Sequence, residues 1–268
     1  MKLYVPKDRY YISQPICTLI AERQKKISSI VNKRIWDGIN SSEHCKYIGA
    51  YGRGTAISEK IIDLLLELPV EGYGVTTKLS IDQLAEMIRK ELITEWVHID
   101  IRTDDHHIRV NFLDGMTFQI LSVMKKRDWY GNDQYIFSDN DNMNNILKRF
   151  NPRAEQEAML EENKNSGGLL LDTCKHIRYL RDTYFSREPV SDDIIDAFSY
   201  SALKNWERLN PDGRRMQSGA YEESILEYWN NVSWNGTSAF QLRMPGSQRL
   251  VAVSQGINCL GAIIKLMT

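Results

Sequence analysis

The chain has 268 residues, of which 42% are hydrophobic and 26% charged, and its formal net charge is -1. This composition is typical of a folded globular protein and argues against a disordered chain or a coiled coil. The near-neutral charge gives no overall attraction to long nucleic acid or to an acidic membrane, so we expect neither as a partner. The length allows one domain or two closely packed lobes.

The sequence predicts a reduced, cytoplasmic protein. Its cysteines lie far apart and show no Cys-x-x-Cys spacing: Cys17, Cys45, Cys174 and Cys259. The first residues, MKLYVPKDRYY, lack the apolar core of a secretion signal. No stretch approaches the roughly eighteen consecutive apolar residues that a transmembrane helix needs.

Two segments of the first half carry informative patterns. Between residues 10 and 36, apolar residues recur every three or four positions, which predicts an amphipathic helix. Residues 46–69 read KYIGAYGRGTAISEKIIDLLLELP, where three glycines permit a tight turn and 61–68 is an apolar run long enough for a buried strand. A glycine-rich turn leading into a strand with an inward carboxylate is a plausible phosphate and metal site.

The next segments predict a helix and then a small sheet. Residues 80–93 open with a serine cap and place their apolar residues on one face, as a helix does. Short β-rich runs follow at 97–101, 108–112 and 116–123, and Leu113-Asp114-Gly115 predicts a hairpin turn between the last two. We expect these runs to form a mixed sheet with strand 61–68.

The second half predicts helices separated by loops. Residues 129–158 are polar, and 130–145 within them predict a long surface loop, with a new helix beginning after Asn151-Pro152. Residues 229–250 predict an aromatic-rich loop that ends in Pro245-Gly246-Ser247. Helical periodicity marks three further segments, at residues 169–180, 194–203 and 257–266.

The stretch 46–69 resembles the signature of the nucleotidyltransferase superfamily, which is Gly-Ser, then Arg-Gly-Thr, then Asp-x-Asp on a strand. In particular it is similar to the bacterial CD-NTases, relatives of cyclic GMP-AMP synthase that make cyclic oligonucleotides in anti-phage defence. The resemblance implies a bilobal α/β fold, with a small mixed sheet lobe and a helical lobe joined by a long spine helix. It also implies a core lobe with that helix at residues 1–150 and a helical lobe at 151–268.

The resemblance also identifies positions where the catalytic groups of the family are replaced. Ala50 stands where the family has the serine of Gly-Ser, and Ile61 stands where it has the first aspartate. Gln119 stands where it has the third acid, so Asp63 is the one remnant of three metal carboxylates. Glu59 lies in the nearby loop and stays open as a substitute ligand.

Nucleotidyl transfer uses two Mg²⁺ ions that carboxylates hold against the triphosphate. An amide and an alkyl side chain offer Mg²⁺ no charge. We therefore expect no metal site and no cofactor, with Asp63 as a weak alternative metal ligand and Mg²⁺ required only if the chain is active.

Seven positions are expected to bind a ligand on the strength of the resemblance: Gly49, Ala50, Arg53, Thr55, Arg178, Arg181 and Ser191. Family members carry an arginine or lysine pair and then Pro-x-Ser leading to an aspartate in their helical lobe; Pro189 and Asp196 complete the match here. Arg178 and Arg181 lie three positions apart on one helix face, where they could clamp phosphates or form a solvated face.

Two further groups have ordinary structural interpretations. The run Asp104-Asp105-His106-His107 lies between two predicted strands and favours a solvated turn over a metal site, and His98 with Asp100 favours a surface pair. The aromatic residues near the end could stack on a base or form core: Trp206, Tyr228, Trp229 and Trp234.

Three functions remain open. The leading hypothesis is a CD-NTase-like pseudoenzyme of anti-phage defence that binds a nucleotide, a cyclic oligonucleotide or a protein partner from a defence operon. The second is a divergent but active synthase that makes a cyclic oligonucleotide from NTPs. The third is a non-cyclising nucleotidyltransferase that modifies tRNA or protein.

Overall fold

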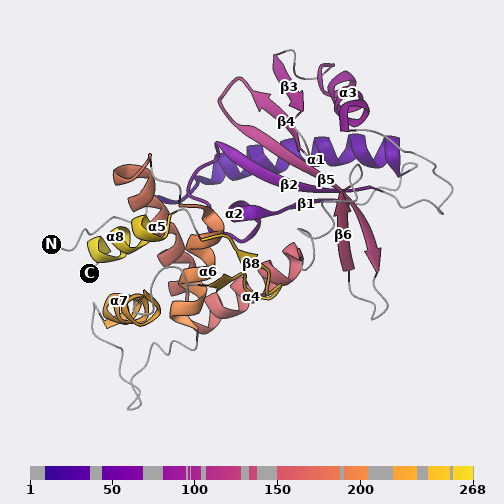
Figure 1. The fold of residues 1–268 in the computed structure, drawn as a ribbon. Coiled ribbons are helices and arrows are strands. Elements are labelled where there is room, and N and C mark those ends of the chain that lie inside the picture. Colours follow the sequence, from indigo (N-terminus) through magenta and orange to yellow (C-terminus); the bar gives the residue numbers. More distant parts are fainter. Residues whose placement is uncertain are drawn as a thin grey trace. The chain divides into compact units, whose positions relative to one another are not determined.

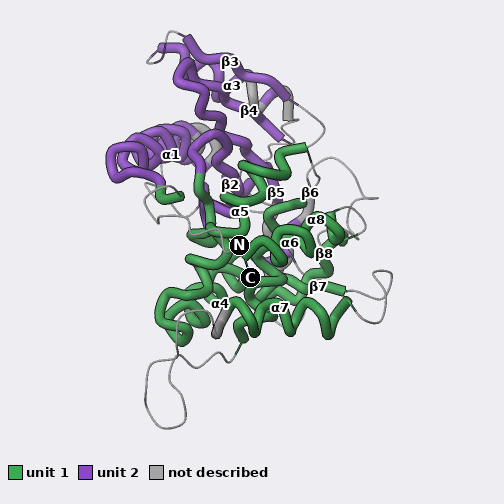
Figure 2. The backbone as a smooth tube through the Cα atoms, turned by 90° about the vertical axis from the view of Figure 1, so that its left-hand side faces the viewer, with its two compact units in different colours: residues 1–11, 53–57, 152–268 green, residues 12–52, 58–151 purple. Residues whose placement is uncertain are grey.

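The computed structural model describes residues 10–36, 44–68, 81–94, 96, 98–103, 107–127, 133–137, 150–187, 190–204, 220–233, 241–253 and 256–267. The chain divides into two compact units, coloured separately in Figure 2. The sheet unit contains residues 12–52 and 58–151, and the helical unit contains residues 1–11, 53–57 and 152–268. The Arg-Gly-Thr segment therefore belongs to the helical unit, although the turn before it and the strand after it belong to the sheet unit.

The sheet unit is built on a mixed sheet with the strand order β1-β2-β5-β4-β3, and β6 pairs with β5 (Figure 1). Strands β2 and β5 are parallel, and the other neighbours are antiparallel. The strands are β1 (Cys45–Tyr47), β2 (Ile61–Leu68), β3 (Ile99–Thr103), β4 (His107–Phe112), β5 (Thr117–Arg127) and β6 (Asp133–Phe137).

Two helices cover one face of this sheet, α1 (Gln14–Ile35) and α3 (Ile81–Leu92) (Figure 1). Alternate residues of each strand point to opposite faces of the sheet. The apolar residues that point to the face covered by α1 and α3 therefore pack against these helices. The buried core here includes Ile20, Ile27, Ile62, Leu64, Ile88, Val110, Phe118 and Ile120. The opposite face carries Asp63 and Gln119, which are half-buried.

Most predicted elements of the sheet unit are confirmed, including the helix within 10–36, the strand 61–68 and the helix within 80–93. The hairpin turn is also confirmed, with Gly115 at a φ of 87° and the Phe112 amide donating to the Met116 carbonyl. The prediction that 130–145 is one long loop is wrong, because 133–137 form β6. That short run lies among polar residues, and it is held by the extension of β5 to Arg127.

The helical unit contains five helices and a short β-ribbon among its described residues. The helices are α4 (Pro152–Asn165), α5 (Leu169–Tyr184), α6 (Asp192–Leu203), α7 (Ala220–Ser233) and α8 (Ile257–Met267), and the strands are β7 (Leu242–Arg243) and β8 (Leu250–Val251). Their buried apolar faces form a single core that includes Leu170, Ile177, Ile195, Phe198, Ile225, Leu260 and Ile264. Periodicity predicted α5, α6 and α8, which are confirmed.

The prediction of a loop across 229–250 is wrong at both ends. Helix α7 extends through the first residues, and Trp229 is buried edge-on against Phe198, with ring centroids 6.1 Å apart. The Pro-Gly-Ser turn joins β7 to β8, since the Met244 amide donates to the Arg249 carbonyl at 2.8 Å. Trp229 is thus a core residue, while Trp206 and Trp234 lie outside the described residues.

All four cysteines are free thiols in the structure. Among the described residues, no helix combines the length and the hydrophobicity needed to cross a bilayer.

Candidate functional site

The face of the sheet that carries Asp63 presents a row of polar side chains across four strands. Asp63 on β2 is directly opposite Gln119 on β5, and Gln119 is opposite Arg109 on β4. Arg109 is in turn opposite Arg102 on β3, and both arginines are exposed. Residues opposite one another in a sheet point to the same face, so these side chains are neighbours. We call this set the polar row.

A second row runs beside it towards the start of β2. Ile61 is opposite Thr117, which donates to the Asn111 side chain at 2.8 Å. The Asn111 amide donates to Asp100, whose carboxylate also accepts from Arg102 at 2.6 Å. Ile61 is 57% exposed, so an apolar side chain faces solvent next to Asp63.

The Asp63 carboxylate packs against the glycine-rich turn. Gly49 has a φ of 61°, and a Cβ placed on it would lie 2.4 Å from Oδ2 of Asp63. The turn is a single helical turn, α2 (Gly49–Gly52), and Ala50 in it is buried.

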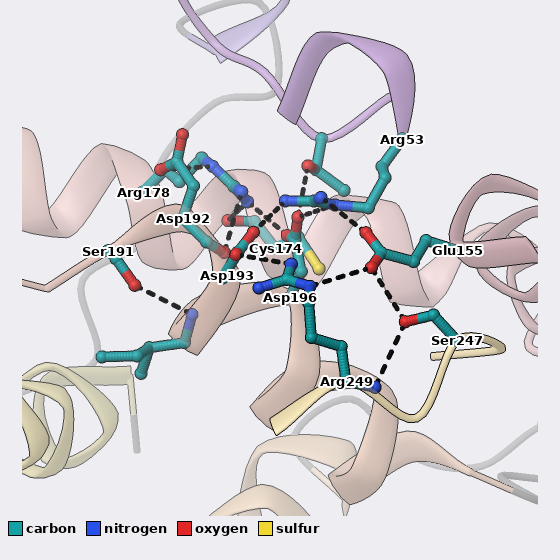
Figure 3. Close-up of polar contacts among 12 residues, drawn as sticks. Arg53, Glu155, Cys174, Arg178, Ser191, Asp192, Asp193, Asp196, Ser247 and Arg249 are labelled. Atoms are coloured by element: carbon teal, nitrogen blue, oxygen red, sulfur yellow. Dashed lines mark hydrogen bonds and ion pairs between the residues drawn. The ribbon is translucent and has the colours of Figure 1, made fainter. Parts of the chain in front are cut away.

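A second group of charged residues lies within the helical unit, and its central members are buried (Figure 3). At its centre Asp196 of α6 is completely buried and accepts three hydrogen bonds. Oδ2 accepts from Nε of Arg53 at 2.7 Å and from the Thr55 hydroxyl at 3.0 Å. Oδ1 accepts from Nη1 of Arg178 at 2.7 Å.

Arg53 reaches two more carboxylates, Glu155 of α4 at 3.2 Å and Asp193 of α6 at 2.8 Å. Arg249, which follows the Pro-Gly-Ser turn, bonds to the same two acids at 3.4 and 2.8 Å. Ser247 donates to Glu155 at 2.9 Å. The two arginines and two acids thus form a closed ring, visible in Figure 3.

The sequence-predicted arginine pair of α5 belongs to the same group. Arg178 is buried, and its Nε donates to Asp192 at 3.1 Å in addition to its bond to Asp196. Arg181 donates to Asp192 at 2.7 Å and to the Val190 carbonyl at 3.0 Å. We call the whole set the charge network; its members are Arg53, Thr55, Glu155, Arg178, Arg181, Asp192, Asp193, Asp196, Ser247 and Arg249.

Ser191 has a local role at the start of α6. Its backbone is extended, and its hydroxyl accepts a hydrogen bond from the Ile194 amide at 3.3 Å. A serine in this position satisfies one of the amides that a helix leaves unpaired at its first turn. Ser191 is therefore an N-cap.

The electrostatics of the charge network favour ionised aspartates. Burial raises the pKa of Asp196, but Arg178 and Arg53 lower it by more, so this pKa lies below its usual range. The pKa of Asp193 is lowered in the same way by Arg53 and Arg249, against burial. Burial raises the pKa of Glu155, which its arginine neighbours offset only in part.

The structure therefore places the seven predicted ligand-binding positions in two groups. Gly49 and Ala50 belong to the sheet unit, next to Asp63. The other five belong to the helical unit, in the charge network or at the cap of α6: Arg53, Thr55, Arg178, Arg181 and Ser191. A phosphate that bound Arg178 would have to displace Asp196 and Asp192 from it.

Sequence reasoning missed several members of both groups. The acidic partners Glu155, Asp192 and Asp193 were not singled out, although Ser-Asp-Asp at a helix start is a recognisable cap with acids in the first turn. Arg109 was also missed. Alternation in His107–Phe112 marks it as facing away from the core, but only the strand register places it beside Gln119.

The donor set at Asp63 does not fit a pair of Mg²⁺ ions. Its neighbours in the sheet are an amide and an alkyl side chain, whereas Mg²⁺ takes hard oxygen ligands in an octahedral arrangement. Across the described part of the chain, no three residues of the types His, Cys, Asp and Glu are grouped so as to hold a metal. Asp104, Asp105 and His106 lie outside the described residues, and Glu59 is half-buried before β2.

Comparison of the sequence with family models and with curated proteins gave no match. Solved structures do match over nearly the whole chain. A STING-associated CdnE cyclic di-GMP synthase from Capnocytophaga granulosa matches with a TM-score of 0.67 at 14% identity, covering 96% of this chain and 81% of that one. CdnC of E. coli MS115-1, solved with HORMA-deltaN, matches at 0.63 and 12%, covering 97% and 84%.

The cyclic AMP-GMP synthase DncV of Vibrio cholerae matches with a TM-score of 0.57 at 11% identity, covering 97% of this chain and 86% of that one. The chain has the CD-NTase fold. At this level of identity the agreement fixes the architecture, and the predicted mixed sheet and helical part of a nucleotidyltransferase are confirmed.

Proposed function

We propose that this chain is a CD-NTase-like protein of anti-phage defence that has lost metal-dependent nucleotidyl transfer and acts by binding. The occupant would be a nucleotide, a cyclic oligonucleotide or a protein partner. The observation that carries the proposal is the polar row, in which Asp63 is opposite Gln119, at the position where the resemblance implies the third acid. Ile61, at the position of the first aspartate, is exposed beside it.

The chemistry of the reaction makes this loss decisive. Two metal ions must bridge the triphosphate, activate the attacking hydroxyl and neutralise the leaving pyrophosphate. One carboxylate cannot hold both ions, and Gln119 contributes no charge. The residues that remain can position and bind a ligand, but they supply no group for the transfer step.

The ligands and partners of the matching structures support binding of either kind. One CdnC structure contains ATP, and another is a complex with HORMA-deltaN. A DncV structure contains a linear dinucleotide intermediate. We therefore propose that this chain binds a nucleotide or a protein partner. We also propose that it acts in the cytoplasm.

The experiment that tests the proposal is a product assay. The purified chain is incubated with all four NTPs and with Mg²⁺ or Mn²⁺, and products are identified by mass spectrometry. We expect no product from the unmodified chain, nor from an Ile61→Asp variant, because one restored carboxylate leaves Gln119 and Ala50 unchanged. The triple variant Ile61→Asp, Gln119→Glu, Ala50→Ser should regain Mg²⁺ binding, measured by calorimetry.

The alternative function is a divergent synthase that uses other metal ligands, and Glu59, close before β2, is the residue that would favour it. Synthesis of a cyclic oligonucleotide by the unmodified chain, abolished by Asp63→Ala, would establish this alternative and overturn the proposal. Adding tRNA or protein acceptors to the same assay tests a non-cyclising transferase.

A further inference from the structure

We propose that the contact between the segment Tyr10-Tyr11 and helix α5 is an acid-sensitive switch, closed while the His176 imidazole is neutral and released when it takes up a proton. The inference goes beyond the proposed function and does not depend on it, because it concerns side chains of the helical unit alone. It is carried by the aromatic rings packed on α5 and by the surroundings of His176.

Both tyrosines lie along one face of α5. The Tyr11 hydroxyl donates to Asp172 at 2.5 Å, and Nζ of Lys175 lies 3.9 Å from the centre of the Tyr11 ring. Tyr10 is buried, and its ring stacks on that of His176, with centroids 6.3 Å apart and 14° between the planes. Residues three or four positions apart on a helix are neighbours on its surface, so a single face of α5 receives the whole segment.

The segment can leave α5 without unfolding the unit. The apolar core that the described helices share does not include Tyr10. Tyr11 is the last residue of its part of the helical unit, since the chain enters the sheet unit at Ile12. Regions with few buried apolar contacts open locally at a lower free energy than the core does. We therefore expect a local release rather than global unfolding.

His176 lies in surroundings that disfavour its charged form. It is half-buried against Tyr10, and among the described residues its Nε2 has no hydrogen-bond partner. Burial lowers the pKa of His176, and the charge of Glu222 on α7 raises it by less. Asp172 and Lys175, on the same helix face, carry opposite charges. In the described part of α4, α6 and α8, which also pack on α5, no charged residue shifts this pKa.

Two opposing effects act on a protonated His176. An imidazolium is attracted to the face of an aromatic ring such as that of Tyr10, but a buried charge without a partner loses its hydration at a greater cost. The lowered pKa of His176 shows that burial outweighs the attractions. The closed contact is therefore most stable above the ordinary histidine pKa of about 6.5, and this stability is lost as the pH falls through the lowered pKa.

The test is hydroxyl-radical footprinting of the full chain from about pH 7.5 to about pH 5, with the oxidation of each tyrosine read by tandem mass spectrometry. This window lies above the range near pH 4 in which carboxyl groups ordinarily titrate. Tyr10 is 5% exposed and Tyr184 is 53% exposed, so Tyr184 is the internal reference. We expect the oxidation of Tyr10, relative to Tyr184, to be low at neutral pH and to rise as the pH falls below about 6.5.

Variants separate the imidazole from a general effect of acid. His176→Phe keeps an aromatic ring against Tyr10 but cannot take up a proton, so Tyr10 should stay protected over the whole range. His98→Phe is the matched control, because His98 is exposed in the sheet unit, and it should show the same rise as the unmodified chain. Glu222→Gln removes the charge that raises the pKa of His176, so the midpoint of the rise should move to lower pH.

The results that would overturn the inference follow from these expectations. Constant protection of Tyr10 in the unmodified chain would do so, as would an equal rise in His176→Phe. A midpoint that Glu222→Gln leaves unchanged would also do so, because the rise would then not report the protonation of His176.

Discussion

The helical unit and the sheet unit differ in where their charged side chains lie. In the helical unit, four arginines and four carboxylates of the charge network bond to one another, and Asp196 at its centre is completely buried. In the sheet unit, the polar row is exposed at Arg102 and Arg109 and half-buried at Asp63 and Gln119, and its one carboxylate is opposite an amide.

Residues of the stretch 46–69 therefore have different physical roles in the two units. Asp63 lies on the sheet face that carries the polar row, with Gly49 against its carboxylate, whereas Arg53 and Thr55 bond to Asp196 inside the other unit. We interpret Arg53 and Thr55 as stabilising the helical unit. These bonds are made within the helical unit and do not involve Ile61 or Gln119 of the sheet unit.

The largest effect should come from breaking the charge network. We expect Arg53→Met to lower the free energy of unfolding by about 3–5 kcal/mol, since it removes the partner of three carboxylates, two of which are almost completely buried. Urea denaturation measures it. The control is Arg153→Ala, which removes an exposed ion pair on α4 and should change the free energy by less than about 1 kcal/mol. Equal effects would mean that the network does not stabilise the helical unit.

A smaller effect should follow from a side chain at Gly49. We expect Gly49→Ala to lower the free energy of unfolding by about 2 kcal/mol, because the residue has a positive φ and the new methyl group must displace the Asp63 carboxylate. Gly115→Ala is the control: it also has a positive φ but has nothing within 4 Å of its Cβ, so it should lose only about 1 kcal/mol. Thermal and urea unfolding measure the loss of stability in both variants. An equal loss in the two would contradict the packing of Asp63 on Gly49.

The smallest effect concerns the cap of α6. We expect Ser191→Ala to lower the free energy of unfolding by about 1 kcal/mol and to leave ATP affinity unchanged. Ser201→Ala on the same helix is the control, since that hydroxyl donates back to the Ala197 carbonyl and its loss should be nearly neutral. If Ser191→Ala bound ATP more weakly but kept full stability, Ser191 would be a ligand-binding residue. The helical unit would then contribute to ligand binding as well as to stability.

Elements with a local pattern could be predicted from the sequence. The strand 61–68 and the helices α1, α3, α5, α6 and α8 follow from periodicity, because each buries one side of a regular element against a core. The sequence also has Ile61 and Gln119 at two positions where the family resemblance implies acids, which stays a prediction. Strand β6 and helix α7 were not predicted, because polar neighbours hid the pattern of β6 and aromatic residues hid that of α7.

Which charged residues contact one another depends on the fold. Arg53 and Asp196 are 143 positions apart, and no local pattern reports that Arg53 bonds to α6 while its neighbour Gly52 belongs to the sheet unit. The register that sets Arg109 beside Gln119 is likewise a property of paired strands, because a shift by one residue would move every side chain to the other face. Burial of a charge depends on contacts between distant segments, so the same arginine in the sequence can be a ligand for phosphate or a partner for aspartate until the fold places it.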